Sequence, residues 1–340
     1  MKKKNNTKII VRFGCVVIFA ISLIFIAVGS AGAQNVKLTL STYFNPGYTF
    51  ILKPTENFAK KVEERTKGQV KIQIFHSAQL YKDKEEIPAC ERGDIDLTMP
   101  LDTYSEGFIP QIGIASLPFL FKDNEAMQRS LDGGLWEKIG ARQALFQRNL
   151  VLLGGATAGG YQIYSKEAVT TPDQFKGKIW AASGGTPSKV IQAMGGAPTT
   201  MGSGELYLAL QRKTVDATTR PLVTGAGRKL HEVVSHLTVT NMYFCNNIFM
   251  MNKKSWDKLP KDFQDIVQKS AKERDQEQLK MILEYEKNVI GEYKTKGLTV
   301  HFPDEAQINA FKKAVAPVIK EWESTIPNGK EFVEYAKTHQ

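Results

Sequence analysis

The stretch from Phe175 to Pro221 decides the fold of the second half of this chain. It begins Phe-Lys-Gly-Lys-Ile-Trp and continues through the turn Ser183-Gly-Gly-Thr-Pro187 to Met194-Gly-Gly-Ala-Pro198. Gly204-Glu-Leu-Tyr-Leu-Ala-Leu-Gln211 and Thr214-Val-Asp-Ala-Thr-Thr-Arg220 follow. The placement of apolar residues, glycines and prolines predicts a strand at 178–182, helices at 187–194 and 203–211, and a short strand that ends at Asp216.

The first half of the chain shows the same alternation of elements. Alternating apolar residues predict strands at 36–40, 70–74 and 94–99, and the segments between them predict helices at 54–66 and 83–92. A β-α-β-α-β order favours a largely parallel sheet with helices on its faces. The sequence therefore predicts an α/β protein.

A single long helix is expected near the C-terminus. From Pro260 to Lys296 only Gly291 interrupts a helix-compatible sequence, which predicts about 37 residues, or roughly 55 Å at 1.5 Å per residue. One lobe cannot contain a helix of this length, so we expect it to run along two. We predict that lobe I comprises 34–155 with about 246–282, and that lobe II comprises 156–245 with about 283–340. Pro317 should kink or break the helix that follows.

The N-terminus has the features of a secretory signal peptide at 1–33. A basic start precedes an apolar run at 16–28, and Ala31-Gly-Ala33 is a small-residue cleavage site. An uncleaved anchor is the alternative, but the run is short for a membrane span. The full chain has a net charge of +10, and removal of the leader with its five basic residues leaves +5. With no basic run interleaved with aromatic residues, nucleic acid is not an expected partner. Cys90 and Cys245 remain, and they are either buried free thiols, which we favour, or a disulfide.

The quoted motifs resemble the DctP family, the solute-binding proteins of tripartite ATP-independent periplasmic (TRAP) transporters. That family reads "lkG-k-i-R-v", then "lGa-P", then "e-v-y-a-l-q-x-G-x-v-D", and Glu64-Arg-Thr-Lys-Gly68, Gly93-Asp-Ile-Asp-Leu97 and Leu117-Pro-Phe-Leu120 also match it. The resemblance implies a two-lobed periplasmic binding protein (type II-like) with a long helix that bridges both lobes. It also implies a ligand in the interlobe cleft and closure by hinge bending.

Two residues decide how the resemblance bears on the ligand. In the family, the arginine of "i-R-v" grips a substrate carboxylate, and Trp180 stands at that position here. Trp180 is either a cleft wall that stacks on the ligand or a core tryptophan. Counting from Asp216, Arg220 matches a polar family residue that contacts the ligand. We hypothesise that the positive charge has moved to Arg220, with a surface or interlobe arginine as the alternative.

The other candidate ligand-binding residues come from matching positions or from strand ends. A second family arginine is absent, and Tyr161 and Gln162 occupy its region, which suggests an aromatic, sulfonated or less charged ligand. The turn at Ser183 and Gly184 offers backbone N–H groups to an anion. The apolar segment 242–252 predicts a strand that returns toward lobe I, and this strand and the strand ends of lobe I supply the remaining candidates, which are Asn246, Tyr43, Phe44 and Tyr104. For these residues and for Tyr161 a purely structural role is the alternative.

We therefore expect the binding component of a TRAP transporter in the periplasm. It would capture a small organic anion and deliver it to a small and a large membrane subunit, without a cofactor. A ligand-presenting protein for a sensor kinase or chemoreceptor is the alternative. An enzyme is not expected, because His231 and His236 do not share a helix face and no catalytic motif appears. A homodimer is compatible with the resemblance.

Overall fold

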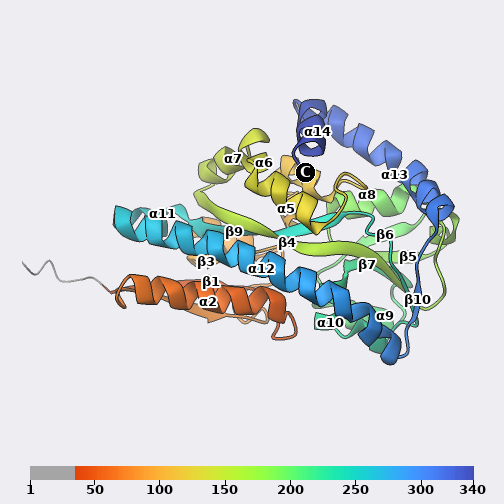
Figure 1. The fold of residues 1–340 in the computed structure, drawn as a ribbon, viewed down its shortest axis with the longest axis horizontal. Helices are drawn as coiled ribbons and strands as arrows, with labels where there is room; N and C mark the ends of the chain where they lie inside the picture. Colours follow the sequence, from red (N-terminus) through yellow and green to blue (C-terminus); the bar gives the residue numbers. More distant parts are fainter. Residues whose placement is uncertain (1–34) are drawn as a thin grey trace, which may run out of the picture. The chain divides into compact units, whose positions relative to one another are not determined.

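The strands form one mixed sheet that runs through both halves of the molecule. The computed structural model describes residues 35–340, so the predicted signal peptide at 1–33 lies outside the described residues. The strand order is β2-β1-β3-β9-β4-β7-β5-β6, and β8 pairs with both β4 and β10. We call the half with β2, β1, β3, β9 and residues 150–160 of β4 lobe I, and the half with the other strands lobe II (Figure 1). The predicted two-lobed α/β arrangement is confirmed.

Lobe I combines parallel and antiparallel strands. The parallel pair joins β1 (Val36–Ser41) to β3 (Leu97–Thr98), and β3 pairs in the antiparallel sense with β9 (Phe244–Asn252). The edge strand is β2 (Val70–Phe75). Helix α2 (Thr49–Arg65) begins five residues before the predicted start at Pro54, because Phe50, Ile51 and Leu52 are buried and favour an earlier turn. Pro54 removes only one hydrogen bond from this helix.

Lobe II is built around three short strands. The central strand β5 (Ile179–Ala182) is parallel to β6 (Ala197–Thr200) and to β7 (Ala217–Pro221). β7 then pairs antiparallel with the second part of β4 (Leu150–Ser165). The predicted end of this strand at Asp216 is wrong, because the strand begins at Ala217, where its side chains become buried. A smaller pair, β8 (His236–Thr238) and β10 (Thr299–His301), completes this lobe.

Three elements cross between the lobes. β4 and β9 pair from Leu150 to Gly160, and the glycine-rich run Gly154–Gly160 lies in the middle of β4, where the pairing has two irregularities. The third element is α12 (Lys261–Thr295), which contacts α2 in lobe I and β10 in lobe II (Figure 1). The predicted long helix is therefore confirmed.

Short helices complete the two lobes. In lobe I they are α3 (Glu86–Arg92), α4 (Asp102–Ser105), η1 (Pro110–Ser116), α5 (Asn124–Asp132), α6 (Leu135–Lys138), α7 (Ala141–Gln147) and α11 (Lys253–Asp257). In lobe II they are η2 (Pro172–Phe175), α8 (Gly185–Ala193), α9 (Leu206–Gln211), α10 (Leu222–Gly227) and η3 (Leu230–Glu232). Within residues 35–340, no helix is both long and apolar enough to cross a membrane.

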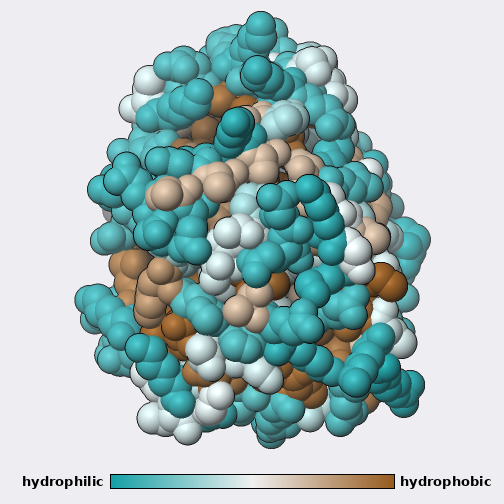
Figure 2. Space-filling model, turned by 90° about the vertical axis from the view of Figure 1, so that its right-hand side faces the viewer, coloured by the Kyte–Doolittle hydropathy of each residue, from teal (hydrophilic) through white to brown (hydrophobic). Residues whose placement is uncertain are grey.

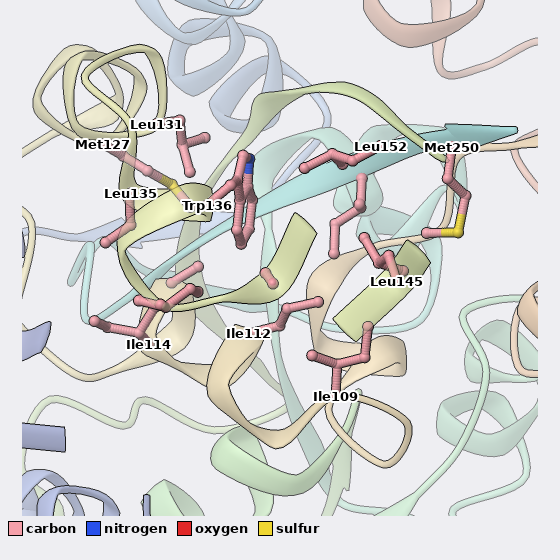
Figure 3. Close-up of a cluster of buried hydrophobic side chains, with 14 of the residues drawn as sticks. Ile109, Ile112, Ile114, Met127, Leu131, Leu135, Trp136, Leu145, Leu152 and Met250 are labelled. Carbon is pink, nitrogen blue, oxygen red and sulfur yellow. The ribbon is translucent and has the colours of Figure 1, made fainter. Parts of the chain in front are cut away.

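Each lobe has its own apolar core. The core of lobe I gathers side chains from η1, α5, α6, α7, β4 and β9, among them Ile112, Met127, Trp136 and Met250 (Figure 3). A second core lies in lobe II between β4, β5, α9 and α12. On the face shown in Figure 2, hydrophilic residues predominate and apolar residues form separate patches.

The C-terminal helices differ from the predictions in two respects. Helix α13 (Glu305–Thr325) continues through Pro317, so of the two predicted effects of this proline, a kink or a break, the break does not occur. One lost hydrogen bond is tolerated there because apolar residues on both sides of the proline, including Val315 and Val318, are buried. Trp322 of α13 and Ala336 of α14 (Gly329–Thr338) belong to the core of lobe I. The predicted boundaries assigned about 283–340 to lobe II, whereas residues of α13 and α14 also contribute to the core of lobe I.

Candidate ligand-binding cleft

Arg220 is a buried guanidinium without an anionic partner. It lies near the end of β7 and is only 1% exposed. Nη1 donates to the carbonyl oxygen of Thr219 at 3.1 Å, Nη2 donates to that of Met201 at 3.3 Å, and Nε has no partner. By contrast Arg274, the other fully buried arginine, lies 2.5 Å from a carboxylate oxygen of Asp275. Among the described residues, no Asp or Glu forms an ion pair with Arg220.

A buried charge without a directly bonded counter-charge is unfavourable. The charge of Arg220 acts on the groups around it, and it opposes the burial that raises the pKa of the Asp83 carboxyl group. Burial raises the pKa of the Tyr104 hydroxyl above its ordinary value, and Arg220 opposes that shift. The same holds for Tyr243. The surroundings of Arg220 therefore favour the binding of an anion.

Aromatic side chains from both lobes surround this region. In lobe I, the Tyr43 ring lies 5.8 Å from that of Tyr104 and 4.2 Å from that of Phe44, which lies behind it. In lobe II, the ring of Tyr161 stacks on that of Tyr243 at 4.3 Å. The hydroxyl of Tyr43 is buried and has no partner. Tyrosines supply flat apolar surface together with a polar tip, which suits a small planar solute.

A pocket of about 340 Å³ opens between the lobes beside these residues. Its walls come from the end of β1, from the segment after β2, from the turn before α9, and from the residue after α10. They are lined by Tyr43, Ser77, Ala78, Lys82, Asp83, Gly202, Gly204, Glu205 and Arg228. Gly202 follows Met201, whose carbonyl oxygen accepts from Arg220. The pocket thus comes within one residue of a contact of Arg220, although Arg220, Tyr104, Tyr161 and Tyr243 do not themselves line it.

Hydrogen bonds join the two lobes around the pocket. Asp83 Oδ2 accepts from the Ser203 backbone N–H at 3.0 Å, and Arg228 Nη2 donates to the Tyr43 carbonyl oxygen at 3.2 Å. Asn45 Nδ2 donates to the Gly227 carbonyl oxygen at 3.0 Å. Burial raises the pKa of Asp83, and the Ser203 N–H opposes the shift. The pocket is thus closed on one side by direct contacts between lobes.

Trp180 lies in the core and not on a cleft wall. It is 0% exposed, its ring stacks on Phe175 at 3.8 Å and 6°, and its Nε1 donates to the Phe175 carbonyl oxygen at 3.1 Å. Both its ring face and its N–H are thus used within the protein. The core alternative left open by the sequence describes this geometry, and we do not retain Trp180 as a ligand contact.

Trp180 and Arg220 also lie on opposite faces of the sheet. β5 and β7 pair with Trp180 opposite Ala217 and Ala181 opposite Thr218. Side chains alternate between faces along a strand, so Arg220 shares a face with Thr218 and therefore with Ala181. The residue of β5 on the side of Arg220 is Ala181, whose small side chain leaves room for the guanidinium group.

Gln162 forms hydrogen bonds inside the protein and not toward the pocket. Its Oε1 accepts from the backbone N–H groups of Thr240 and Asn241 at 2.8 and 2.9 Å, and its Nε2 donates to the Gly160 carbonyl oxygen at 3.0 Å. The amide thus holds the segment before β9. Its hydrogen-bonding groups are used within lobe II and at the crossing strands, which argues against contact with a solute.

Asn246, Tyr161 and Ser183 are buried where the lobes meet. Asn246 Nδ2 lies 2.9 Å from Asp102 Oδ2, while its Oδ1 has no partner. The Tyr161 hydroxyl lies 2.9 Å from Ser183 Oγ. Gly184 approaches lobe I so closely that a Cβ there would lie 1.9 Å from the Thr103 carbonyl oxygen. The turn at Ser183 and Gly184 therefore contacts the opposite lobe directly.

Sequence reasoning missed three polar residues of the cleft, namely Asp83, Arg228 and Tyr243. Asp83 was assigned only to a helix start, although α3 begins at Glu86. Tyr243 immediately precedes β9, and its position one residue before a buried strand end was the available signal. For Arg228 we find no local signal, because its partners Tyr43 and Ser203 are far away in the sequence.

Cys90 and Cys245 are free and buried, as the preferred interpretation of the sequence predicted. Burial raises the pKa of both thiols. A thiol of this kind is inert, since the thiolate is the reactive form. Among residues 35–340, no group of three or more His, Cys, Asp or Glu side chains is arranged to hold a metal ion.

Comparisons with known proteins agree with this architecture. The model of bacterial extracellular solute-binding protein family 7 (DctP) matches residues 41–325. A solute-binding protein of Verminephrobacter eiseniae is 29% identical over 313 residues, which are 92% of this chain and 91% of the relative. The sialic acid-binding periplasmic protein SiaP of Vibrio cholerae is 25% identical over 309 residues, 90% of this chain and 95% of the relative.

Solved structures show the same fold. The TRAP periplasmic solute-binding protein of Chromohalobacter salexigens, with bound D-glucuronate, superposes with a TM-score of 0.84 at 24% identity and covers 89% of this chain and 100% of its own. The corresponding protein of Sulfurospirillum deleyianum, with bound succinate, has a TM-score of 0.83 at 24% identity and covers 90% and 100%. The predicted periplasmic-binding-protein fold is confirmed by these structures.

Proposed function

Because this chain belongs to bacterial extracellular solute-binding protein family 7, the DctP family of TRAP transporter proteins, we propose that it captures a small organic anion beside Arg220 and delivers it to TRAP membrane subunits. Members of this family bind solutes and are not enzymes. Arg220 carries the proposal, since its guanidinium is 1% exposed and has no carboxylate partner in the described chain. A ligand carboxylate or sulfonate supplies the missing charge.

The aromatic side chains around Arg220, of which Tyr43 lines the pocket, support a ligand with a flat apolar part. Tyr43 and Tyr104 approach edge to face from lobe I, and Tyr161 and Tyr243 form a stacked pair in lobe II. An aromatic carboxylate fits this combination of rings and the Arg220 guanidinium, while Lys82 and Arg228 on the pocket wall offer positive charge to a second anionic group. The named relatives with bound glucuronate or succinate agree on a carboxylate as the shared feature.

The proposal includes export and closure. The leader at 1–33 directs the chain to the periplasm and is removed near Ala33, in agreement with the periplasmic relatives. The ligand binds when the lobes are closed, and it stabilises that state because it contacts both lobes at once. The TRAP membrane subunits then receive the solute from the closed protein.

A thermal-shift screen tests the proposal. The mature protein is unfolded and refolded to remove bound solute, and is then mixed with aliphatic and aromatic carboxylates, 2-oxo acids, sulfonates, sugar acids, amino acids and neutral polyols. A ligand at about 100 times its Kd adds about 2.7 kcal/mol of stability. We expect shifts with anions only, and the largest with an aromatic carboxylate.

Arg220→Ala is the matching variant, with Arg212→Ala at an exposed position of lobe II as the control. Loss of one partner of a buried charge pair costs about 2–5 kcal/mol, so we expect affinity to fall at least about 30-fold in Arg220→Ala and to stay unchanged in Arg212→Ala. Shifts with neutral solutes alone, or an Arg220→Ala variant within about twofold of the wild type, would contradict the proposal.

A further inference from the structure

Glu106 joins the lobes on the side of the cleft away from the ligand pocket. We propose that its carboxyl group is a clasp that closes the cleft by capping the N-terminus of α8, and that this clasp makes closure depend on pH. The proposal rests on the proposed function, because it describes how the same cleft closes. The ligand pocket beside Arg220 does not include Glu106, so the clasp is a positioning device and not a ligand contact.

The geometry of the clasp is direct. Glu106 follows α4 in lobe I, and its Oε2 accepts from the backbone N–H of Thr186 at 2.6 Å. Thr186 is the second residue of α8, a helix of nine residues whose N-cap residue, Gly184, has no side chain to accept a hydrogen bond. The first N–H groups of a helix need an acceptor and favour negative charge. Here the acceptor comes from the opposite lobe.

Two glycines of the predicted anion-binding turn let the lobes meet. A Cβ at Gly184 would lie 1.9 Å from the Thr103 carbonyl oxygen, and a Cβ at Gly185 would lie 2.8 Å from Glu106 Oε2. Gly184 has an extended backbone with a φ of 178°, so its conformation does not require glycine. Glycine is required there by the close contact with the Thr103 carbonyl oxygen. The turn is therefore shaped to receive Glu106, and the protein itself supplies the anion that the sequence assigned to the ligand.

The surroundings of Glu106 link the clasp to protons. Its second oxygen, Oε1, is buried without a partner, and so is Trp322 Nε1, which lines the same pocket of about 280 Å³. Burial raises the pKa of Glu106 to about 7, and the hydrogen bonds from Thr186 and the charge of Lys189 oppose the shift. Asp102 of α4 is a second buried carboxyl group nearby, and burial, together with Glu106, raises its pKa well above its ordinary value.

The remaining groups around the clasp do not change this balance. Lys189 forms an ion pair with Glu321 of α13 at 2.7 Å, so its charge is partly neutralised. η1 contributes no titratable side chain, since its sequence is PQIGIAS. When the lobes separate, the Glu106 carboxyl group returns to water and its pKa falls toward the ordinary value. Between the ordinary pKa of the open state and the raised pKa of the closed state, Glu106 is protonated only when the lobes are closed. Closure therefore weakens as the pH rises through about 7.

Interlobe distance measurements in the ligand-free protein test the clasp. Lys60→Cys in lobe I and Lys176→Cys in lobe II are exposed labelling sites, while Cys90 and Cys245 are buried. Pulsed electron–electron double resonance then measures the distances between the two spin labels, which give the closed fraction at pH 6 and pH 8. We compare the wild type with Glu106→Ala, which removes the acceptor, and with Glu106→Gln, which keeps an oxygen acceptor without the charge.

We expect a wild-type closed fraction that falls from pH 6 to pH 8. Glu106→Gln should stay at the wild-type pH 6 value at both pH values, and Glu106→Ala should lower the closed-to-open ratio about tenfold at pH 6, the loss expected for one hydrogen bond. Glu305→Gln removes an exposed carboxylate at the start of α13 and should behave as the wild type. Equal closed fractions in Glu106→Ala and the wild type, or no closed population in the wild type, would overturn the proposal.

The measurement needs no ligand, so it fails or succeeds independently of the proposed function. A protein in which Arg220→Ala loses anion binding while Glu106→Ala closes normally would keep the function and discard the clasp. A protein that binds no anion but in which Glu106→Ala weakens closure as expected would keep the clasp and discard the proposed function.

Discussion

Replacement of Trp180 tests whether the residue at the family arginine position belongs to the core or to the ligand site. The side chain is 0% exposed, stacks on Phe175 at 3.8 Å and donates to the Phe175 carbonyl oxygen at 3.1 Å. Truncation of a buried tryptophan to alanine costs about 3–5 kcal/mol, and loss of the hydrogen bond is included in that figure. Trp180→Phe keeps most of the stacking, so we expect a loss of about 1–2 kcal/mol.

These losses translate into measurable unfolding temperatures. For a chain of about 307 residues at about 2.1 cal/mol/K per residue, about 1 kcal/mol corresponds to roughly 1.5 °C, so we expect Trp180→Ala to unfold about 5–8 °C below the wild type in a thermal scan. Trp180→Arg should be at least as unstable, because it buries a charge against Phe175 in the core instead of restoring a carboxylate grip. The half-buried Trp256 offers a control, and Trp256→Phe should change the temperature little.

Ligand affinity separates the two interpretations. Isothermal titration of Trp180→Phe with an anion found in the thermal-shift screen should give a Kd within about twofold of the wild type. A variant with wild-type stability and an affinity weakened about tenfold would refute the core assignment. Gain of carboxylate binding by Trp180→Arg would refute it as well, and would place the side chain of residue 180 on the side of Arg220.

Three further predictions concern other parts of the molecule. Burial raises the pKa of Glu286 to about 7, so the stability that its protonated form contributes is present below the ordinary pKa near 4.5 and is lost as the pH rises through about 7. In urea unfolding, the free energy of unfolding of Glu286→Gln should therefore gain up to about 3 kcal/mol relative to the wild type between pH 4.5 and pH 8. A difference between the two proteins that stays constant with pH would contradict this. Gly184→Ala should weaken anion binding at least about tenfold without lowering the unfolding temperature of the ligand-free protein, because its Cβ would meet the Thr103 carbonyl oxygen only when the lobes are closed. Cys90 and Cys245 should react with a thiol reagent such as DTNB only after denaturation, and rapid labelling of the native protein would show that they are not buried.

Local patterns in the sequence were enough for most of the secondary structure. The absence of proline between 261 and 296 predicted α12 to within a residue at either end, because a helix needs only local hydrogen bonds. Buried apolar runs likewise marked β9. The start of α2 was missed because burial outweighed the effect of Pro54, and the place of α14 was missed because its core partners in lobe I are far away in the sequence.

The candidate site was harder to predict, for a reason that Trp180 illustrates. A shift of one residue along a strand moves a side chain to the opposite face, so a motif match at Trp180 could not show whether 180 or 181 lies on the side of Arg220. Glu106 could not be connected with Thr186 either, since their contact spans 80 residues and depends on how the lobes meet. Arg220, by contrast, was proposed from its distance along the chain to Asp216, and the structure places it on β7, the strand that begins directly after Asp216.

The contact between α12 and β4 has a mechanical consequence. Asp275 accepts from the Gly155 backbone N–H at 3.0 Å, and a Cβ at Gly154 would lie 2.1 Å from the same carboxylate, so the helix is seated directly on the crossing strand at that point. This seat divides the helix (Figure 1) into two lever arms of about 14 and 20 residues, or roughly 21 and 30 Å at 1.5 Å per residue. A tilt of about 10° about the seat would then displace the far end of the longer arm by roughly 5 Å. Through Gly154, Gly155 and Asp275, a small rearrangement where α12 contacts β4 would therefore produce a larger displacement at the two ends of the helix.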